Sequence, residues 1–308
     1  MKNRFFHPKK NLIEELNNLF EFEKKKWNLL RENLEALKKS PSREIEVKNF
    51  KFKLSLNERR KKNITKDISQ KSLSKNKCVL CPQNLPEEEK GIIFLKDYLL
   101  LVNPYPILNH HFVASSIKHK PQLILPHTKF LFTLFEKISK KFFLIYNGPK
   151  CGASQPDHFH LQFCDIKELE VSKIYSREKF KEGIGVNSIY PIPHIYIKCK
   201  SIEEIMDDFL KIFKKISNSF REEEPPLNLI LFELKGHFYL LLFLRKKHRP
   251  SFFYEEGDKK ILISPGAIDL SGTFITPDEK HFKRVNGEIL EEIISQVVYE
   301  KKFLEKFL

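Results

Sequence analysis

The chain has 308 residues, of which 41% are hydrophobic and 12% aromatic, a composition that excludes a disordered protein and suits one large domain or two fused modules. No run of about 18 apolar residues occurs and the N-terminus lacks the apolar core of a signal peptide, so we expect a cytoplasmic protein outside the membrane. Lys and Arg outnumber Asp and Glu by 55 to 40, but they are spread through mixed-charge segments without a recognition motif, so we expect an anionic partner other than nucleic acid.

The first 77 residues read as an N-terminal helical extension. Residues 11–39 carry leucines and aromatics at helical spacing, and Ser40-Pro-Ser42 ends that pattern. Residues 44–53 alternate like a strand, and residues 56–76 are polar and read as a mobile surface segment. The sequence leaves open whether the long helix packs on the body, forms a lid or covers the partner in a homodimer.

Cys78-Val-Leu-Cys81 forms a knuckle whose two thiolates suit one tetrahedral metal ion. By itself this spacing also occurs in redox motifs, but those require a βαβ context that the polar surroundings do not supply. Cys151, Cys164 and Cys199 are separate residues, too few for a disulfide framework.

Short strands then alternate with helical segments, which predicts an α+β fold. We expect a strand pair over residues 91–102, a strand over 112–115, a helix over 128–141 and a strand from residue 142. In the second half we expect a helix over 202–217, a strand over 227–232 and helices over 278–282 and 287–308.

The next strand carries the chemistry. His158-Phe-His160-Leu-Gln162 alternates with period two, which places both histidines and the glutamine on one face. A neutral imidazole has a lone pair that can attack phosphorus, and an amide can stabilise the developing oxyanion. The small residues from Cys151 to Ser154 allow backbone N–H groups to approach an anion. A sheet face with two incidental histidines is the plainer interpretation, and Gln162 with the small-residue loop argues against it.

Ser154 followed by His158-Phe-His-Leu-Gln resembles the active strand of the histidine-triad superfamily, in the branch of galactose-1-phosphate uridylyltransferase, diadenosine tetraphosphate phosphorylase and GDP-hexose phosphorylases. The resemblance implies that His160 is the nucleophile, that Gln162 stabilises the intermediate, and that nearby residues bind phosphate (Asn147, Gly152, Ser154 and Gln155). A Gln in place of a third His favours transfer or phosphorolysis over hydrolysis. One extra residue between Ser154 and His158 departs from the transferase pattern. Cys-x-x-Cys-x-x-Asn-Leu-Pro and Ser264-Pro-Gly-Ala-Ile-Asp also resemble a bacterial set of uncharacterised phosphorylase-like proteins.

The resemblance also implies a structural zinc ion. In the uridylyltransferase a similar knuckle binds zinc with a downstream His and the first His of the active strand. The matching residues here are Cys78, Cys81, His119 and His158. His110, His111 and His127 remain alternatives to His119.

The second half repeats the first faintly. Tyr105-Pro-Ile107 has a counterpart in Tyr190-Pro-Ile192, and His237-Phe-Tyr-Leu-Leu241 matches the active strand with Tyr239 and Leu241 at the positions of His160 and Gln162. We therefore expect two fused histidine-triad-like halves with antiparallel sheet, a catalytic one over residues 78–183 and a silent one over 184–308. A basic run after the silent strand usually forms a solvated edge, but here we favour phosphate contacts from Arg245 and His248.

The expected reaction is nucleotidyl transfer through a covalent histidine intermediate. The substrate class is a nucleotide sugar or dinucleoside polyphosphate, and the acceptor is inorganic phosphate or a sugar phosphate. The alternatives are a dinucleoside polyphosphate hydrolase and a non-catalytic, zinc-stabilised nucleotide- or nucleic-acid-binding protein. The base, the sugar and the acceptor stay open.

Overall fold

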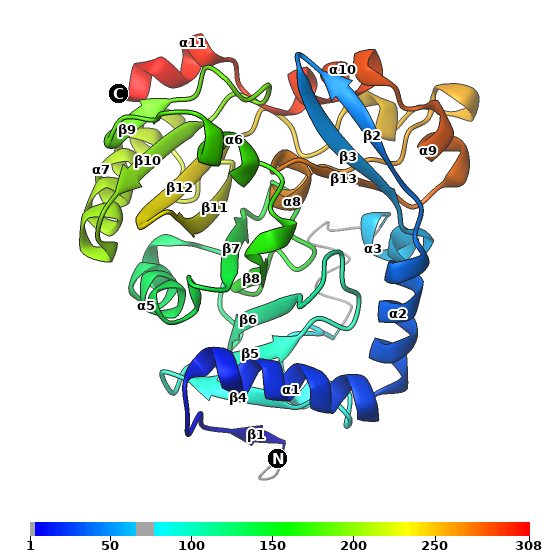
Figure 1. The fold of residues 1–308 in the computed structure, drawn as a ribbon, viewed down its shortest axis with the longest axis vertical. Coiled ribbons are helices and arrows are strands. Elements are labelled where there is room, and N and C mark those ends of the chain that lie inside the picture. Colours follow the sequence, from blue (N-terminus) through cyan, green and yellow to red (C-terminus); the bar gives the residue numbers. More distant parts are fainter. Residues whose placement is uncertain (1–3, 66–76) are drawn as a thin grey trace.

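The computed structural model describes residues 4–65 and 77–308, and a ten-stranded sheet forms its centre (Figure 1). Every strand pair in this sheet is antiparallel except β1 with β4. The strand order is β1 (Phe5–Phe6), β4 (Gly91–Phe94), β5 (Tyr98–Val102), β6 (Phe112–Ser116), β8 (His160–Asp165), β7 (Phe142–Asn147), β11 (Leu227–Leu234), β12 (His237–Leu244), β10 (Ile195–Cys199) and β9 (Gly183–Val186).

The sheet consists of two similar halves joined at its centre, where β7 pairs with β11 and Ile145 lies opposite Ile230. In the first half, helix α5 (Thr128–Ile138) connects β6 to β7, and in the second half α7 (Ile202–Phe220) connects β10 to β11. Each half therefore contains strand, helix, strand and strand in the same order. The predicted α+β fold of two fused halves is confirmed.

The strand register shows which residues of the two halves correspond. Gln162 pairs with Ile145, and Leu241 pairs with Ile230, the symmetry-related position. His160 pairs with Ser115 on β6, and Tyr239 pairs with Lys198 on β10. Tyr239 and Leu241 thus occupy the positions of His160 and Gln162 in the second half. The residue boundaries at 77/78 and 183/184 remain a prediction.

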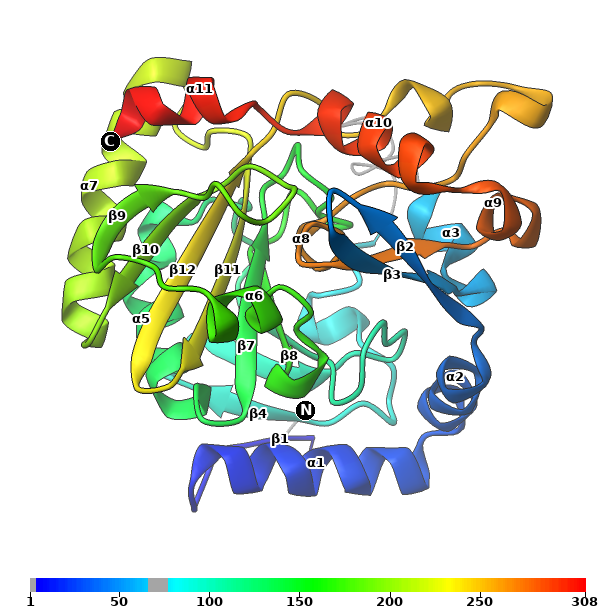
Figure 2. The same cartoon turned by 45° about the horizontal axis from the view of Figure 1, so that its top comes forward.

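The N-terminal segment contains two helices where the periodicity predicted one. Helix α1 (Leu12–Lys26) ends at Trp27, which is extended at φ −102° and ψ 106°, and α2 (Asn28–Lys39) continues in a new direction (Figures 1 and 2). The Trp27 side chain is buried, as are Leu16 of α1 and Leu30 of α2. Both helices thus bury an apolar face on the body, which a straight helix along one line would not achieve.

A second, three-stranded sheet has the order β13-β3-β2. The single strand predicted over residues 44–53 is a hairpin of β2 (Ser42–Val47) and β3 (Phe50–Leu56), because Lys48 and Asn49 adopt positive φ values of 49° and 63° and form a two-residue turn. β3 pairs in parallel with β13 (Thr273–Thr276), so the N-terminal segment and the last part of the chain share this sheet. The mobile segment predicted over 56–76 instead begins with a 3-10 turn (Glu58–Arg60) and a short helix, α3 (Lys61–Ile64); its residues 66–76 lie outside the described residues.

The two faces of the large sheet are covered differently. α1, α5 and α7 pack on one face around buried aromatics such as Phe135 and Phe209. The small sheet, α8 (Ala267–Leu270) and α10 (Gly287–Val297) cover part of the other face, where Ile145 and Ile230 lie. The remaining helices are α6 (Ser172–Arg177), α9 (Glu279–Arg284) and α11 (Lys301–Leu304), so the helix predicted over 287–308 is interrupted. Within the described part of the chain, none of the helices combines the length and apolarity of a transmembrane span.

Candidate functional site

A cavity of about 580 Å³ opens on the face of the large sheet that carries His160 and Gln162. A row of paired residues crosses four strands and forms its floor: Leu101 on β5, Val113 on β6, Gln162 on β8 and Ile145 on β7. Residues of the N-terminal segment and of the loop from Ser264 to Asp269 complete the walls. The first half of the chain therefore supplies the floor, and distant segments enclose it.

His160 lines this cavity and is 4% exposed. Its Nδ1–H donates to the backbone carbonyl of His158 at 2.9 Å, which leaves the lone pair on Nε2. Among the described residues, Nε2 has no hydrogen-bond partner. Burial lowers the pKa of His160 to about 4, so the ring is neutral at physiological pH. The arrangement matches that of an imidazole nucleophile.

His111 sets the orientation of Gln162. The sequence indicated His111 only as an alternative metal ligand. The backbone N–H of Ile107 donates to Nδ1 of His111 at 3.1 Å, so the ring proton resides on Nε2. Nε2 lies 2.8 Å from Oε1 of Gln162 and donates to it. The amide N–H₂ group of Gln162 is then the part left for the cavity.

A second glutamine holds the strand that carries His160. The Gln122 side chain accepts from the backbone N–H of His160 at 2.7 Å and donates to its carbonyl at 2.9 Å. It also donates to the carbonyl of Asn147 at 3.0 Å. Gln122 is fully buried and thus fixes the start of β8 to the end of β7.

Asn147 lines the cavity and belongs to a chain of hydrogen bonds. Its Oδ1 accepts from Asn228 at 2.6 Å and from the backbone N–H of Ala267 at 2.8 Å, so its N–H₂ group remains for a ligand. Asn228 is oriented in turn by Arg245, which donates to its Oδ1 at 2.7 Å.

The predicted phosphate contact of Arg245 is corrected by this geometry. Arg245 is fully buried and does not line the cavity. Its guanidinium donates to protein acceptors through all three nitrogens; these are Asn228 Oδ1 and the carbonyls of Val297, Pro265, Lys247 and His248. Arg245 therefore positions Asn147 through Asn228.

The prediction for His248 is corrected in the same way. His248 lies outside the cavity wall and accepts from the backbone N–H of Gly152 at 3.3 Å. We expected that N–H to face an anion, but it already donates to His248. Gly152 does line the cavity, and its φ of 92° and its close approach to Gly266 require a glycine. Ser154 and Gln155 also line the cavity. Their contacts with phosphate stay a prediction.

Arg60 is a cavity residue that the sequence did not indicate, since it lies in the polar segment after β3. Its Nη1 donates to the carbonyl of Tyr105 at 3.1 Å, and its buried Nε has no hydrogen-bond partner within the described chain. Burial lowers the pKa of Arg60 to about 10, and Asp269 opposes that shift. Arg60 remains cationic at neutral pH and is poorly neutralised, which favours an anionic ligand.

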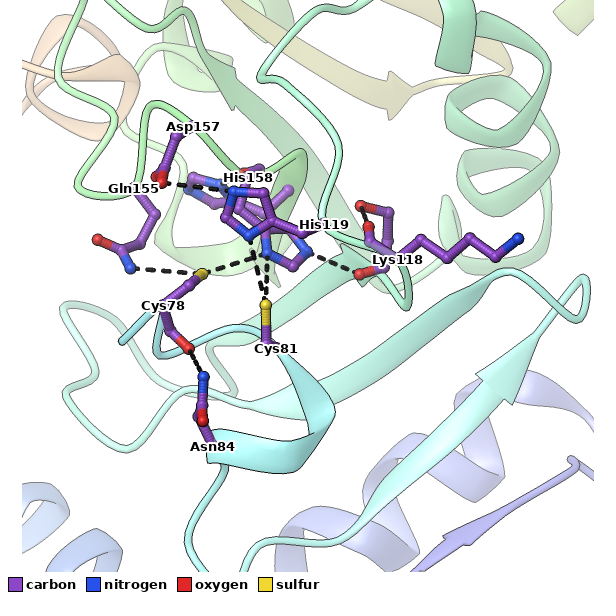
Figure 3. Close-up of polar contacts among 10 residues, drawn as sticks. Cys78, Cys81, Asn84, Lys118, His119, Gln155, Asp157 and His158 are labelled. Carbon is purple, nitrogen blue, oxygen red and sulfur yellow. Dashed lines mark hydrogen bonds and ion pairs between the residues drawn. The ribbon is translucent and has the colours of Figure 1, made fainter. Parts of the chain in front are cut away.

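Beside the cavity, Cys78, Cys81, His119 and His158 point toward one another, and their four ligand atoms lie within 4.8 Å of each other (Figure 3). Nδ1 of His158 is 3.2 Å from the Cys78 sulfur and 3.6 Å from the Cys81 sulfur, and Nδ1 of His119 is 3.3 Å from Cys81. A tetrahedral zinc ion bound at about 2.3 Å by sulfur and 2.1 Å by nitrogen separates such atoms by about 3.6 Å. The four residues fit this ion.

Outer contacts of the cluster agree with metal binding. Nε2–H of His158 donates to the carbonyl of Ser116 at 2.7 Å, and Nε2 of His119 lies 3.4 Å from the Asp157 carboxylate. Both contacts leave the lone pair on Nδ1, which faces the thiols. His110, His111 and His127 lie outside the cluster, and His127 instead contacts the hydroxyl of Tyr98 at 2.6 Å.

Residues 19–165 match a sequence model described as a domain of unknown function (DUF4922). No curated protein sequence matches the chain. The structure is similar to that of yeast Ap4A phosphorylase Apa2 in complex with AMP, with a TM-score of 0.63 at 13% identity, covering 94% of this chain and 96% of that one. The same enzyme in complex with Ap4A gives a TM-score of 0.59 at 13% identity, covering 94% and 98%.

This likeness extends over nearly the whole of both chains. The chain therefore has the same fold as the yeast phosphorylase.

Proposed function

We propose that this protein is a nucleotidyltransferase of the phosphorylase type, with a nucleotide sugar or a dinucleoside polyphosphate as its substrate. One observation carries the proposal: among the described residues His160 Nε2 has no partner, and His160 lines the same cavity as the amides of Gln162 and Asn147. The named ligands of the similar yeast enzyme, AMP and Ap4A, support a nucleotide as the donor.

In the first step, Nε2 of His160 attacks the α-phosphorus. The N–P bond forms as the bond from phosphorus to the leaving oxygen breaks, and that oxygen takes the electron pair. The N–H₂ group of Gln162, held by His111, donates to the phosphoryl oxygen as its charge increases. Asn147 donates to the same group, and Arg60 attracts the negative charge of the substrate.

In the second step, an oxygen of inorganic phosphate or of a sugar phosphate attacks the phosphorus. The N–P bond breaks and returns its electron pair to His160 Nε2. Splitting the displacement in two lets one protein group serve both halves of the reaction. With inorganic phosphate as the acceptor, the product is a nucleoside diphosphate.

The Cys78, Cys81, His119 and His158 cluster is proposed to hold a structural zinc ion, which would supply a rigid tie rather than reaction chemistry. His158 lies two residues before His160, so the cluster fixes the start of the active strand. Such a site contributes on the order of 10 kcal/mol to folding.

Product analysis tests the reaction type. Purified protein is incubated with diadenosine tetraphosphate or a nucleotide sugar, with and without inorganic phosphate. The proposal predicts cleavage that requires phosphate and releases a nucleoside diphosphate, and no cleavage by His160→Ala. Release of a nucleoside monophosphate without phosphate would support the hydrolase alternative, and salt-sensitive nucleotide binding without turnover would support the binding protein.

A further inference from the structure

The cavity wall contains a buried acid, Glu89, that the proposed reaction does not use. Glu89 lines the cavity and is 4% exposed, and no donor among residues 4–65 and 77–308 hydrogen-bonds its carboxyl group. Proteins rarely leave a buried carboxyl without a partner, because desolvation without a compensating hydrogen bond costs free energy. The missing partner points to a ligand.

The strand order fixes where this carboxyl lies relative to the nucleophile. Glu89 lies two residues before β4, and β4, β5 and β6 lead strand by strand to β8, which carries His160. Three strand spacings correspond to about 14 Å. The register places His160 level with Ile93 of β4, four residues from Glu89, which adds about 13 Å along the strands, so the two backbones are about 19 Å apart. The two side chains and a nucleotide with its phosphorus at His160 together span this distance.

The lining changes character along the same path. Where β5 and β6 form the floor, the floor is apolar and consists of Leu101 and Val113. Leu85 and Trp27 line the same cavity. An apolar slot with an aromatic wall suits the faces of a planar base. Glu89 adds the hydrogen-bonding group that such a slot needs to recognise the edge of the base.

Burial keeps this carboxyl neutral. Burial is the largest cause that raises the pKa of Glu89 to about 8; the neighbouring Glu23 carboxyl adds to the shift and Arg4 opposes it. Glu23 is also fully buried and is held by the backbone N–H of Lys90 at 2.6 Å. A neutral carboxyl offers one donor and one acceptor side by side, the pattern found on the pairing edge of nucleobases.

We infer that Glu89 recognises the pairing edge of the substrate's nucleobase, in a slot that the α1–α2 junction closes. The inference rests on the proposed function, since it places the phosphate at His160. It also gives the N-terminal helices a role: α1 lies along β4 (Figures 1 and 2), and Trp27, where α1 ends, lines the same cavity as Glu89.

Trp27 provides the readout because it is the only tryptophan in the chain. Its fluorescence is followed while AMP, GMP, CMP, UMP or ribose 5-phosphate is added. We expect at least one nucleotide to change the emission and to bind about tenfold or more tightly than ribose 5-phosphate. Glu89→Leu reduces that advantage about tenfold, whereas Glu89→Gln, which keeps a donor and an acceptor, changes it by less than about threefold.

Glu88→Leu is the matched control, because Glu88 is exposed and adjacent, and it leaves binding unchanged. The inference is wrong if folded Glu89→Leu binds nucleotides as the wild type does. If Glu89→Leu does not fold, binding by the wild-type protein is the test. Nucleotides that bind no better than ribose 5-phosphate, or that leave the Trp27 emission unchanged, would show that this slot does not bind the base. The proposed function would still stand. Failure of every nucleotide and of ribose 5-phosphate to bind would overturn the proposed function first.

Discussion

Gln162 can stabilise charge on phosphate only with its N–H₂ group turned toward the cavity, and His111 sets that orientation. We predict that His111→Phe, which keeps the ring volume and removes the donor, lowers kcat by about 10- to 100-fold and changes KM little, because the lost interaction acts mainly in the transition state. Steady-state kinetics measure this. His110→Asn is the control: it tolerates the positive φ at that position and leaves the His111–Gln162 contact intact. Equal losses in both variants would contradict the assigned role.

Arg60 is the cation of the cavity, and removing it should weaken the binding of an anionic substrate. Arg60→Met is expected to lower kcat/KM by about 10- to 100-fold, the effect of losing one charged hydrogen bond. The matched variant Lys61→Met removes the adjacent, exposed cation, which does not line the cavity, so it should keep near wild-type kinetics. An unchanged KM and kcat in Arg60→Met would remove Arg60 from the substrate site.

The sequence indicated the residues of the active strand because their chemistry is encoded locally, by period-two alternation of His158, His160 and Gln162. It did not indicate the residues that orient them. His111 reaches Gln162 from just before the start of the neighbouring strand β6, Gln122 reaches His160 from a loop, and Arg60 enters from the N-terminal segment. Such contacts depend on the folded sheet, so no local spacing reveals them. The same reason explains Arg245: a basic run suggests a phosphate contact, whereas its burial became evident only in the fold.

Among the elements, the cysteine knuckle and the start of β8 depend on each other through the metal cluster. We predict about one zinc per chain by elemental analysis. Cys78→Ser or a strong chelator should remove the metal and lower Tm, because the site contributes folding free energy. Cys199→Ser is the control, since Cys199 is a buried cysteine outside the cluster and should leave the metal content unchanged. Full activity and unchanged Tm in metal-free protein would contradict the structural role.

Element boundaries were predicted well where apolar alternation or helical spacing is strong, as for β5, β6, α5 and α7. Three boundaries were missed, one of them the end of the helix predicted over 287–308, which stops at Val297. The break at Trp27 has no proline or glycine to mark it, and the helical pattern continues across it. The hairpin at Lys48 and Asn49 places a positive φ on a lysine, which is a weak turn signal, and on a single asparagine without a following glycine, so the alternation read as one strand.

At the scale of the whole molecule, the buried acids Glu23 and Glu89 make the free energy of unfolding depend on pH. The pKa of Glu23 is raised by burial from 4.5 to about 8, so between these values the unfolded chain ionises first and the free energy of unfolding falls as pH rises. Each such group contributes a slope of about 1.4 kcal/mol per pH unit in that interval. The stabilisation that protonated Glu23 contributes is fully present below pH 4.5 and is lost as pH rises through about 8.

We therefore predict that the Tm of the wild-type protein falls from pH 5 to pH 8, and that the Tm of Glu23→Gln falls less over the same interval. Thermal melts across this range measure the difference. Glu21→Gln, at an exposed position on the same helix, should follow the wild-type curve. A steeper fall in Glu23→Gln than in the wild type would show that the buried acid has the opposite effect.

The two halves of the molecule explain why one His-x-His strand is enough. The second half keeps the strand and helix framework, but Tyr239 and Leu241 stand where the first half has His160 and Gln162. Its contribution to the cavity comes from the loop between Ser264 and Asp269, which holds Asn147 through Ala267. The duplication thus supplies a wall to the site of the first half.

The account depends most on a covalent bond between His160 and a nucleotide. Intact mass spectrometry after mixing the protein with diadenosine tetraphosphate, ADP-glucose, GDP-glucose or UDP-glucose, without phosphate, tests this directly. We predict a mass increase of one nucleoside monophosphate that is lost in acid, is absent in His160→Ala and persists in His237→Ala, a variant of the second half. An adduct that survives in His160→Ala, or turnover of a donor by wild-type protein without any adduct, would contradict the mechanism.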